Sequence, residues 1–167
     1  MIQIVKDSDT RPWFFLQTAH TTYGMWVMET GHLEHLYYGE RITVDSQDPS
    51  SCAPLVIQRA FAPGNTCTYD REHPQISMED ICLEVGTLGK GDIREPFLEV
   101  RFTDGSVTSD FTFDSYKVIT LKEREQCLQT SGLPHSYSEA ETDSAECLQI
   151  VLQDVTNHLE LQLFYTV

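Results

Sequence analysis

Acidic side chains are the most abundant groups in this sequence that could perform chemistry. The 167 residues include 26 Asp and Glu against 11 Lys and Arg, which gives a formal net charge of -15. Two carboxylates about 5–10 Å apart across a sugar ring would support glycoside hydrolysis. With so many acids, candidate pairs occur everywhere, and none lies in an apolar stretch that would raise its pKa. The sequence therefore nominates no catalytic residue within this chain.

The histidines and cysteines predict no metal site. His32 and His35 are three residues apart in a stretch with a strand pattern, where positions i and i+3 face opposite sides. The five cysteines are odd in number and widely spaced, unlike a disulfide framework. We expect free thiols, and hence a protein of the reducing cytoplasm. The cysteines are Cys52, Cys67, Cys82, Cys127 and Cys147.

The glycine-rich stretch GTLGKGDIREP, residues 86–96, raises the question of a phosphate site. It lacks the G-x-x-x-x-G-K-[ST] pattern and precedes a strand pattern, so its amides would not converge at a helix N-terminus. We interpret it as a structural loop that enters a strand at Pro96, where no ladder donor is needed. A contact between Asp92 and Arg94, or from each to nearby backbone, would fix this loop.

The charge balance excludes several classes of partner. A net charge of -15 is unsuited to nucleic acid, which requires clustered Lys and Arg, and to anionic membranes. No apolar run approaches the ~20 residues of a membrane span, and the N-terminus has no signal-peptide pattern. A neutral ligand such as a sugar, or a protein partner, remains compatible. The aromatic runs WFF, YGMW and LYYG could stack on sugars, although we expect them mainly in the core and an interface.

Alternation of apolar and polar residues at period 2 dominates the sequence and predicts β-strands. It is clearest in CLQIVLQD and HLELQLFYTV, which VTNH connects as a hairpin. Four more candidates occupy the first 40 residues: MIQIVKD, WFFLQTA, YGMWVMET and HLEHLYYG. FLEVRF, residues 97–102, is another. Asp104-Gly105 after it predicts a hairpin, with SDFTFDSYKVITLK as the returning strand.

These strands predict an all-β fold, a large antiparallel β-sandwich with little helix and one buried face on each sheet. Residues 121–132 are expected to hold no more than one helical turn. Residues 45–74 form a long irregular stretch of the kind that is often functional. Because the strand pattern runs to Val167 without a polar tail, we expect the polypeptide to continue beyond it.

Ordered motifs along the chain resemble the α-galactosidases of glycoside hydrolase family 36. RAFAP, residues 59–63, is similar to the family's RAFSP, and GKGDIREP to its G-x-x-D-[FY]-R-x-P. SGLPHSY and the final segment from Glu146 to Val167 match two further patterns. The motifs cover nearly the whole chain, and their order is more specific than any one alone. Six residues match the family's opening pattern: Tyr23, Gly31, Leu33, His35, Tyr37 and Gly39.

The resemblance implies that residues 1–167 form a single N-terminal β-supersandwich domain, followed by a catalytic (β/α)8 barrel that this chain lacks. The full protein would be a retaining α-galactosidase that hydrolyses terminal α-galactosides of the melibiose and raffinose type, with both catalytic aspartates in the barrel. No metal or organic cofactor is implied. A cytoplasmic homo-oligomer is implied, a tetramer in the full-length enzyme. Its partners would be its own barrel and the galactoside substrate.

The resemblance also implies that loops of this domain reach the mouth of a neighbouring subunit's active site. Residues 45–74 are the natural candidate, and Arg59 is the residue we name as the substrate contact. The sequence departs from the family at Gln58, where an acid is common, and at residues 64–66, where GNT shortens an extension. CLEVG keeps Glu84 but loses the Tyr-Pro that usually follows.

Two other functions remain open from the sequence. The chain could be a free-standing carbohydrate-binding module, which would bind galactose or raffinose in the millimolar range. It could also be an interaction domain unrelated to sugars, which would show neither sugar binding nor an accompanying barrel.

Overall fold

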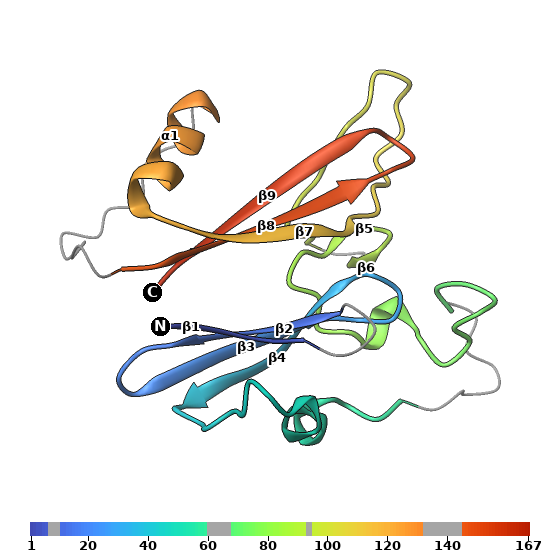
Figure 1. Ribbon diagram of the computed structural model, residues 1–167. Coiled ribbons are helices and arrows are strands. Elements are labelled where there is room, and N and C mark those ends of the chain that lie inside the picture. Colours follow the sequence, from blue (N-terminus) through green and yellow to red (C-terminus); the bar gives the residue numbers. More distant parts are fainter. Residues whose placement is uncertain (7–10, 60–67, 93–94, 132–144) are drawn as a thin grey trace.

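The fold is known from a computed structural model, which describes residues 1–6, 11–59, 68–92, 95–131 and 145–167. Two antiparallel sheets face each other as layers, with both chain termini at the same end of the sandwich (Figure 1). The elements are β1 (Ile2–Lys6), β2 (Pro12–Gln17), β3 (Thr21–Val27), β4 (Leu33–Glu40), η1 (Pro49–Leu55), η2 (Met78–Asp80), β5 (Thr87–Leu88), β6 (Gly91–Asp92), β7 (Thr112–Ile119), α1 (Leu121–Ser131), β8 (Cys147–Asp154) and β9 (Leu159–Thr166). The predicted all-β sandwich with little helix is confirmed.

Both large sheets have simple connections. One is a four-stranded meander with the order β1-β2-β3-β4, and the other has the order β7-β8-β9. All neighbours in these two sheets are antiparallel, and β8 and β9 form the predicted hairpin. A 3-10 helix, η1, lies beyond the outer face of the four-stranded sheet, and α1 lies beyond the three-stranded sheet (Figure 1).

The main core lies between the sheets and follows from the alternation in the strands. Leu148, Ile150 and Leu152 of β8 are at most 1% exposed and pack in one cluster with Phe14 of β2. The ring of Phe14 also contacts Tyr116 of β7 edge to face, with centroids 5.1 Å apart. Alternation at period 2 therefore places one face of each strand in this core.

The prediction of one exposed face per sheet is wrong for the four-stranded sheet. All six residues of β2 are buried, because the chain after β4 returns across the outer face. There Phe15 packs in a second cluster with Val44 and Cys52. A strand covered on both faces needs apolar residues at consecutive positions, which accounts for the unbroken run WFFL.

Two other segments differ from the sequence prediction. Residues 97–102 form no strand, and Leu98 makes only an isolated bridge to Thr87. α1 has 11 residues instead of one turn. The Thr120 N–H donates to Glu123 at 2.8 Å and the Glu123 N–H donates back to Thr120 Oγ1 at 3.3 Å, a capping box that stabilises the helix start.

The hairpin predicted at Asp104-Gly105 is not formed, because residues 97–102 are not a strand, but the chain does turn there. Gly105 has a φ of 88°, which glycine adopts without strain, and its N–H donates to the Phe102 carbonyl at 3.0 Å. Within the described ranges, no helix is long and apolar enough to cross a membrane.

Candidate functional site

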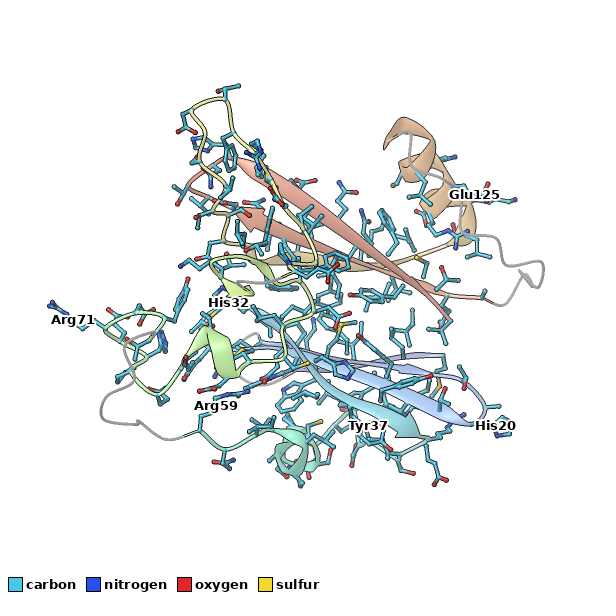
Figure 2. The ribbon with its side chains drawn as sticks, turned by 180° about the vertical axis from the view of Figure 1, so that it is seen from behind. His20, His32, Tyr37, Arg59, Arg71 and Glu125 are labelled. Carbon is cyan, nitrogen blue, oxygen red and sulfur yellow. The ribbon has the colours of Figure 1, made fainter. Side chains whose placement is uncertain are left out.

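Arg59, the predicted substrate contact, is paired with a buried carboxylate on the side of the four-stranded sheet that faces away from the other sheet (Figure 2). The Glu34 side chain on β4 is 0% exposed, and its two oxygens accept hydrogen bonds from the two terminal nitrogens of Arg59. Its Oε2 also accepts from Trp26 Nε1 at 2.7 Å. Trp26 and Glu34 are register partners in the β3–β4 pair, so their side chains share one face.

A cavity of about 210 Å³ lies beside this ion pair. Its lining combines cationic side chains and one carboxylate, Glu29, with amide and apolar groups that include Gln58, Trp26 and Ile57. The Nε of Arg59 is buried and has no hydrogen-bond partner among the described residues. Guanidinium and amide N–H groups donate to hydroxyl oxygens, while an indole ring packs against C–H groups. The cavity is therefore suited to a neutral hydroxylated ligand and supplies no pair of facing carboxylates.

A second polar cluster surrounds His32, which the sequence placed in no site. The imidazole is buried, with Nδ1 at 2.8 Å from Thr30 Oγ1 and Nε2 at 2.8 Å from Asp110 Oδ1. Asp110 Oδ2 accepts from the Tyr69 hydroxyl at 3.1 Å and lies 3.3 Å from Lys90 Nζ. Burial and the nearby Asp110 carboxylate raise the pKa of Tyr69 to about 12. The cluster joins residues from four separate segments of the chain.

The order of hydroxyl, imidazole and carboxylate in this cluster has the connectivity of a nucleophilic triad. Asp110 is already occupied, however, by partners from three sides. Neither the cavity beside Arg59 nor the one between α1 and the three-stranded sheet is lined by Thr30 or His32. The cluster is best explained as a set of hydrogen bonds that connects these loops and stabilises their arrangement.

The electrostatics of Asp110 predict acid sensitivity. Burial raises the pKa of this carboxyl, but hydrogen bonds from His32 and Tyr69 and the charge of Lys90 outweigh burial and hold the pKa below its usual value of 3.8. A depressed folded-state pKa contributes stability that is complete above the unfolded value and is lost as the pH falls through the folded value. The pKa of Asp154 is also lowered. Burial raises it, but hydrogen bonds from Asn157 and from the Asp110 N–H outweigh burial.

We therefore expect the Asp110→Asn variant to be less stable than the wild type at pH 7, with a difference that shrinks as the pH falls below about 4. Thermal unfolding between pH 7 and pH 2.5, followed by circular dichroism, measures this. The exposed Asp80→Asn provides the control. A difference between wild type and Asp110→Asn that stays constant down to pH 2.5 would contradict the assigned role.

Glu84 joins the two sheets. Its oxygens accept from the Tyr23 hydroxyl of β3 at 2.8 and 2.7 Å, and Oε1 also accepts from the Tyr165 hydroxyl of β9 at 2.7 Å. His35 Nδ1 lies 3.9 Å from Oε2, and the Glu84 side chain is 9% exposed. Burial and the charge and hydrogen bonds of Glu84 raise the pKa of both tyrosines well above the usual value. The carboxylate is thus an acceptor for both layers of the sandwich.

The remaining predicted residues are only partly described. Arg94, Cys67, residues 60–63 of RAFAP and residues 132–137 of SGLPHSY lie outside the described residues, and so does the predicted Asp92–Arg94 contact. The backbone of Asp92 belongs to β6, next to a tight turn in which Gly89 has a φ of 80°. The described portion of the chain contains no cluster of three or more metal-ligating side chains. Cys52, Cys82 and Cys147 are free thiols.

Comparisons with known proteins agree on one family. The sequence profile of the glycosyl hydrolase family 36 N-terminal domain matches residues 31–167. The bifunctional α-galactosidase/sucrose kinase AgaSK of Mediterraneibacter gnavus is 34% identical over 155 residues, which cover 92% of this chain and 15% of that protein. The α-galactosidase AgaA of Geobacillus stearothermophilus is 31% identical over 153 residues, covering 92% of this chain and 19% of AgaA.

Solved structures give the same result. The crystal structure of the α-galactosidase from Lactobacillus brevis superposes with a TM-score of 0.74 at 29% identity, covering 98% of this chain and 20% of that one. A variant of Geobacillus stearothermophilus AgaA, crystallised with raffinose, superposes with a TM-score of 0.69 at 25% identity, covering 93% and 20%. The chain therefore spans about a fifth or less of the length of these relatives.

Proposed function

The chain belongs to the glycosyl hydrolase family 36 N-terminal domain family, and from this premise we propose that it is the scaffold and oligomerisation domain of a retaining α-galactosidase. On its own it is inactive, and a downstream (β/α)8 barrel performs the hydrolysis. The observation that carries this proposal is the hydrogen bonding of four buried or partly buried carboxylates. Glu34, Glu84, Asp110 and Asp154 are each bound by groups of the protein itself, which leaves none of these four to act on a sugar.

The proposed reaction requires two carboxylates of the barrel. In a retaining mechanism one carboxylate attacks the anomeric carbon, and the other protonates the leaving oxygen and later activates water. The substrates would be terminal α-galactosides of the melibiose and raffinose type. Raffinose in a structure of AgaA, a relative in this family, supports the substrate class. Neither a metal nor an organic cofactor takes part in this mechanism.

We assign Arg59 the role of a polar contact with substrate at the active-site mouth of a neighbouring subunit. Arg59 borders the 210 Å³ cavity, and its charge is held at the surface of the four-stranded sheet by Glu34. This role requires an oligomer, for which we propose a tetramer. The free thiols of Cys52, Cys82 and Cys147 support a reducing compartment, the cytoplasm.

The same cavity favours a second candidate function, a carbohydrate-binding module. Its indole ring and N–H donors suit a sugar whether or not a catalytic barrel is near. Calorimetric titration of residues 1–167 with galactose and raffinose separates the two functions. Millimolar binding by this chain alone would favour the module, whereas the scaffold proposal predicts no measurable heat of binding.

The scaffold role predicts a clear effect of removing the domain. Light scattering should give the mass of four subunits for the full-length protein. A version without residues 1–167 should lose that assembly and at least roughly tenfold in kcat/KM, because uncovered apolar faces and misplaced loops distort the site. Hydrolysis of raffinose provides the activity measurement. A truncated protein that still assembles as a tetramer and keeps its kinetics would contradict the proposal.

A further inference from the structure

We propose that Glu34 is a positioning residue for substrate binding, acting through Arg59 with Trp26 as its support. The inference rests on the proposed function, because Arg59 meets a galactoside only in the assembled enzyme. Glu34 itself touches no substrate. It determines where the guanidinium of Arg59 lies and which of its N–H groups remain for a ligand.

The contacts of Arg59 explain why it needs such a partner. Arg59 follows η1 in an irregular segment, so no strand or helix fixes its direction. Its described polar contacts are the two to Glu34 and a long one, 3.5 Å, to the Ile57 carbonyl. Glu34, in contrast, is 0% exposed and lies in β4 opposite Trp26, just past the register shift between Gly24 and Met25. The buried carboxylate of Glu34 therefore fixes the position of the Arg59 guanidinium, which the irregular segment around Arg59 does not fix.

Trp26 fixes Glu34 in turn. The indole N–H donates to Glu34 Oε2 at 2.7 Å, and the indole ring packs on Trp13 with centroids 4.8 Å apart. Trp26 also lines the cavity beside Arg59. The same side chain thus orients the carboxylate and forms a wall of the ligand space.

Stability alone is a poor explanation for this arrangement. Burying a charged pair costs desolvation, and apolar residues of similar volume often give an equal or higher stability. Apolar clusters already surround the site, with Trp26 packed against both of them. A guanidinium has five N–H groups, and Glu34 engages only its two terminal nitrogens on one side. Those N–H groups of the terminal nitrogens that neither Glu34 nor the Ile57 carbonyl accepts can then donate to hydroxyl oxygens of a sugar.

The test is made on the full-length enzyme with raffinose as substrate. Glu34→Gln keeps the shape but removes the charge that holds Arg59, so KM should rise roughly tenfold while kcat stays within about twofold. Arg59→Lys should raise KM to a similar extent. The double variant should be no worse than the stronger single one, because the two residues act as one unit.

The matched control is Glu84→Gln, the same chemical change in a buried carboxylate between the sheets. It should lower the melting temperature and leave KM unchanged. If Glu34→Gln proves too unstable to purify, Trp26→Phe removes the indole N–H but keeps a ring, and KM should rise by a factor of about three. An unchanged KM in the folded Glu34 or Trp26 variants, with active wild type, would overturn this inference alone. An inactive wild type would overturn the proposed function and this inference with it.

Discussion

Replacing Glu84 by alanine should lower the free energy of unfolding of the domain by about 2–5 kcal/mol, because two tyrosine hydroxyls lose their shared acceptor. Tyr23 and Tyr165 donate to this carboxylate from opposite sheets at 2.7–2.8 Å. Without it, both hydroxyls are left between the layers, and an unpaired buried hydroxyl costs about 1–3 kcal/mol. Urea denaturation followed by circular dichroism measures the change.

Graded variants separate the hydrogen bonds from the space that the side chain fills. Glu84→Gln keeps one acceptor oxygen and should lose less stability than Glu84→Ala. In a double-mutant cycle, Tyr165→Phe should cost much less when Glu84 is already alanine. The exposed Glu99→Ala should change stability by no more than about 0.5 kcal/mol. A loss of similar size for Glu99→Ala and Glu84→Ala would show that Glu84 does not join the sheets.

The sandwich itself was predictable because alternation in a strand is a local signal. β8 and β9 alternate cleanly, and their pairing and inward faces follow the sequence pattern. β2 does not alternate, since residues far along the chain cover its second face. This covering segment comes from elsewhere in the chain, so the sequence of β2 alone does not reveal it. The length of α1 was also underestimated, although Thr120 and Glu123 have the spacing of a capping box.

The candidate site was predictable only in part. The sequence pointed to Arg59 through a motif resemblance, but it gave no sign that Glu34 is its partner. The pairing depends on the β3–β4 register and on the path of the chain after η1, which bring together residues 25 positions apart. Glu84 and Tyr165 are 81 positions apart and meet only because the two sheets stack. Patterns in a single sequence report on residues that are close along the chain, so they do not reveal contacts between residues this far apart in sequence.

We expect residues 1–167 on their own to hydrolyse no α-galactoside. A retaining glycosidase loses its covalent step without a free nucleophilic carboxylate and a second acid. Among the described residues, the buried or partly buried acids Glu34, Glu84, Asp110 and Asp154 are bound by other side chains. These partners are Trp26, Tyr23, Tyr165, His32 and Asn157. The full-length enzyme should exceed the isolated domain by the whole catalytic acceleration, which for enzymes is at least about 10⁶-fold.

The most direct measurement is release of aryl alcohol from an aryl α-galactoside by purified residues 1–167, after circular dichroism has shown that the sample is folded. The full-length protein is assayed beside it at equal molar concentration. We expect turnover by the full-length protein and no release above the buffer blank by the domain. Hydrolysis by the folded domain that rises in proportion to its concentration, and persists through further purification, would contradict it.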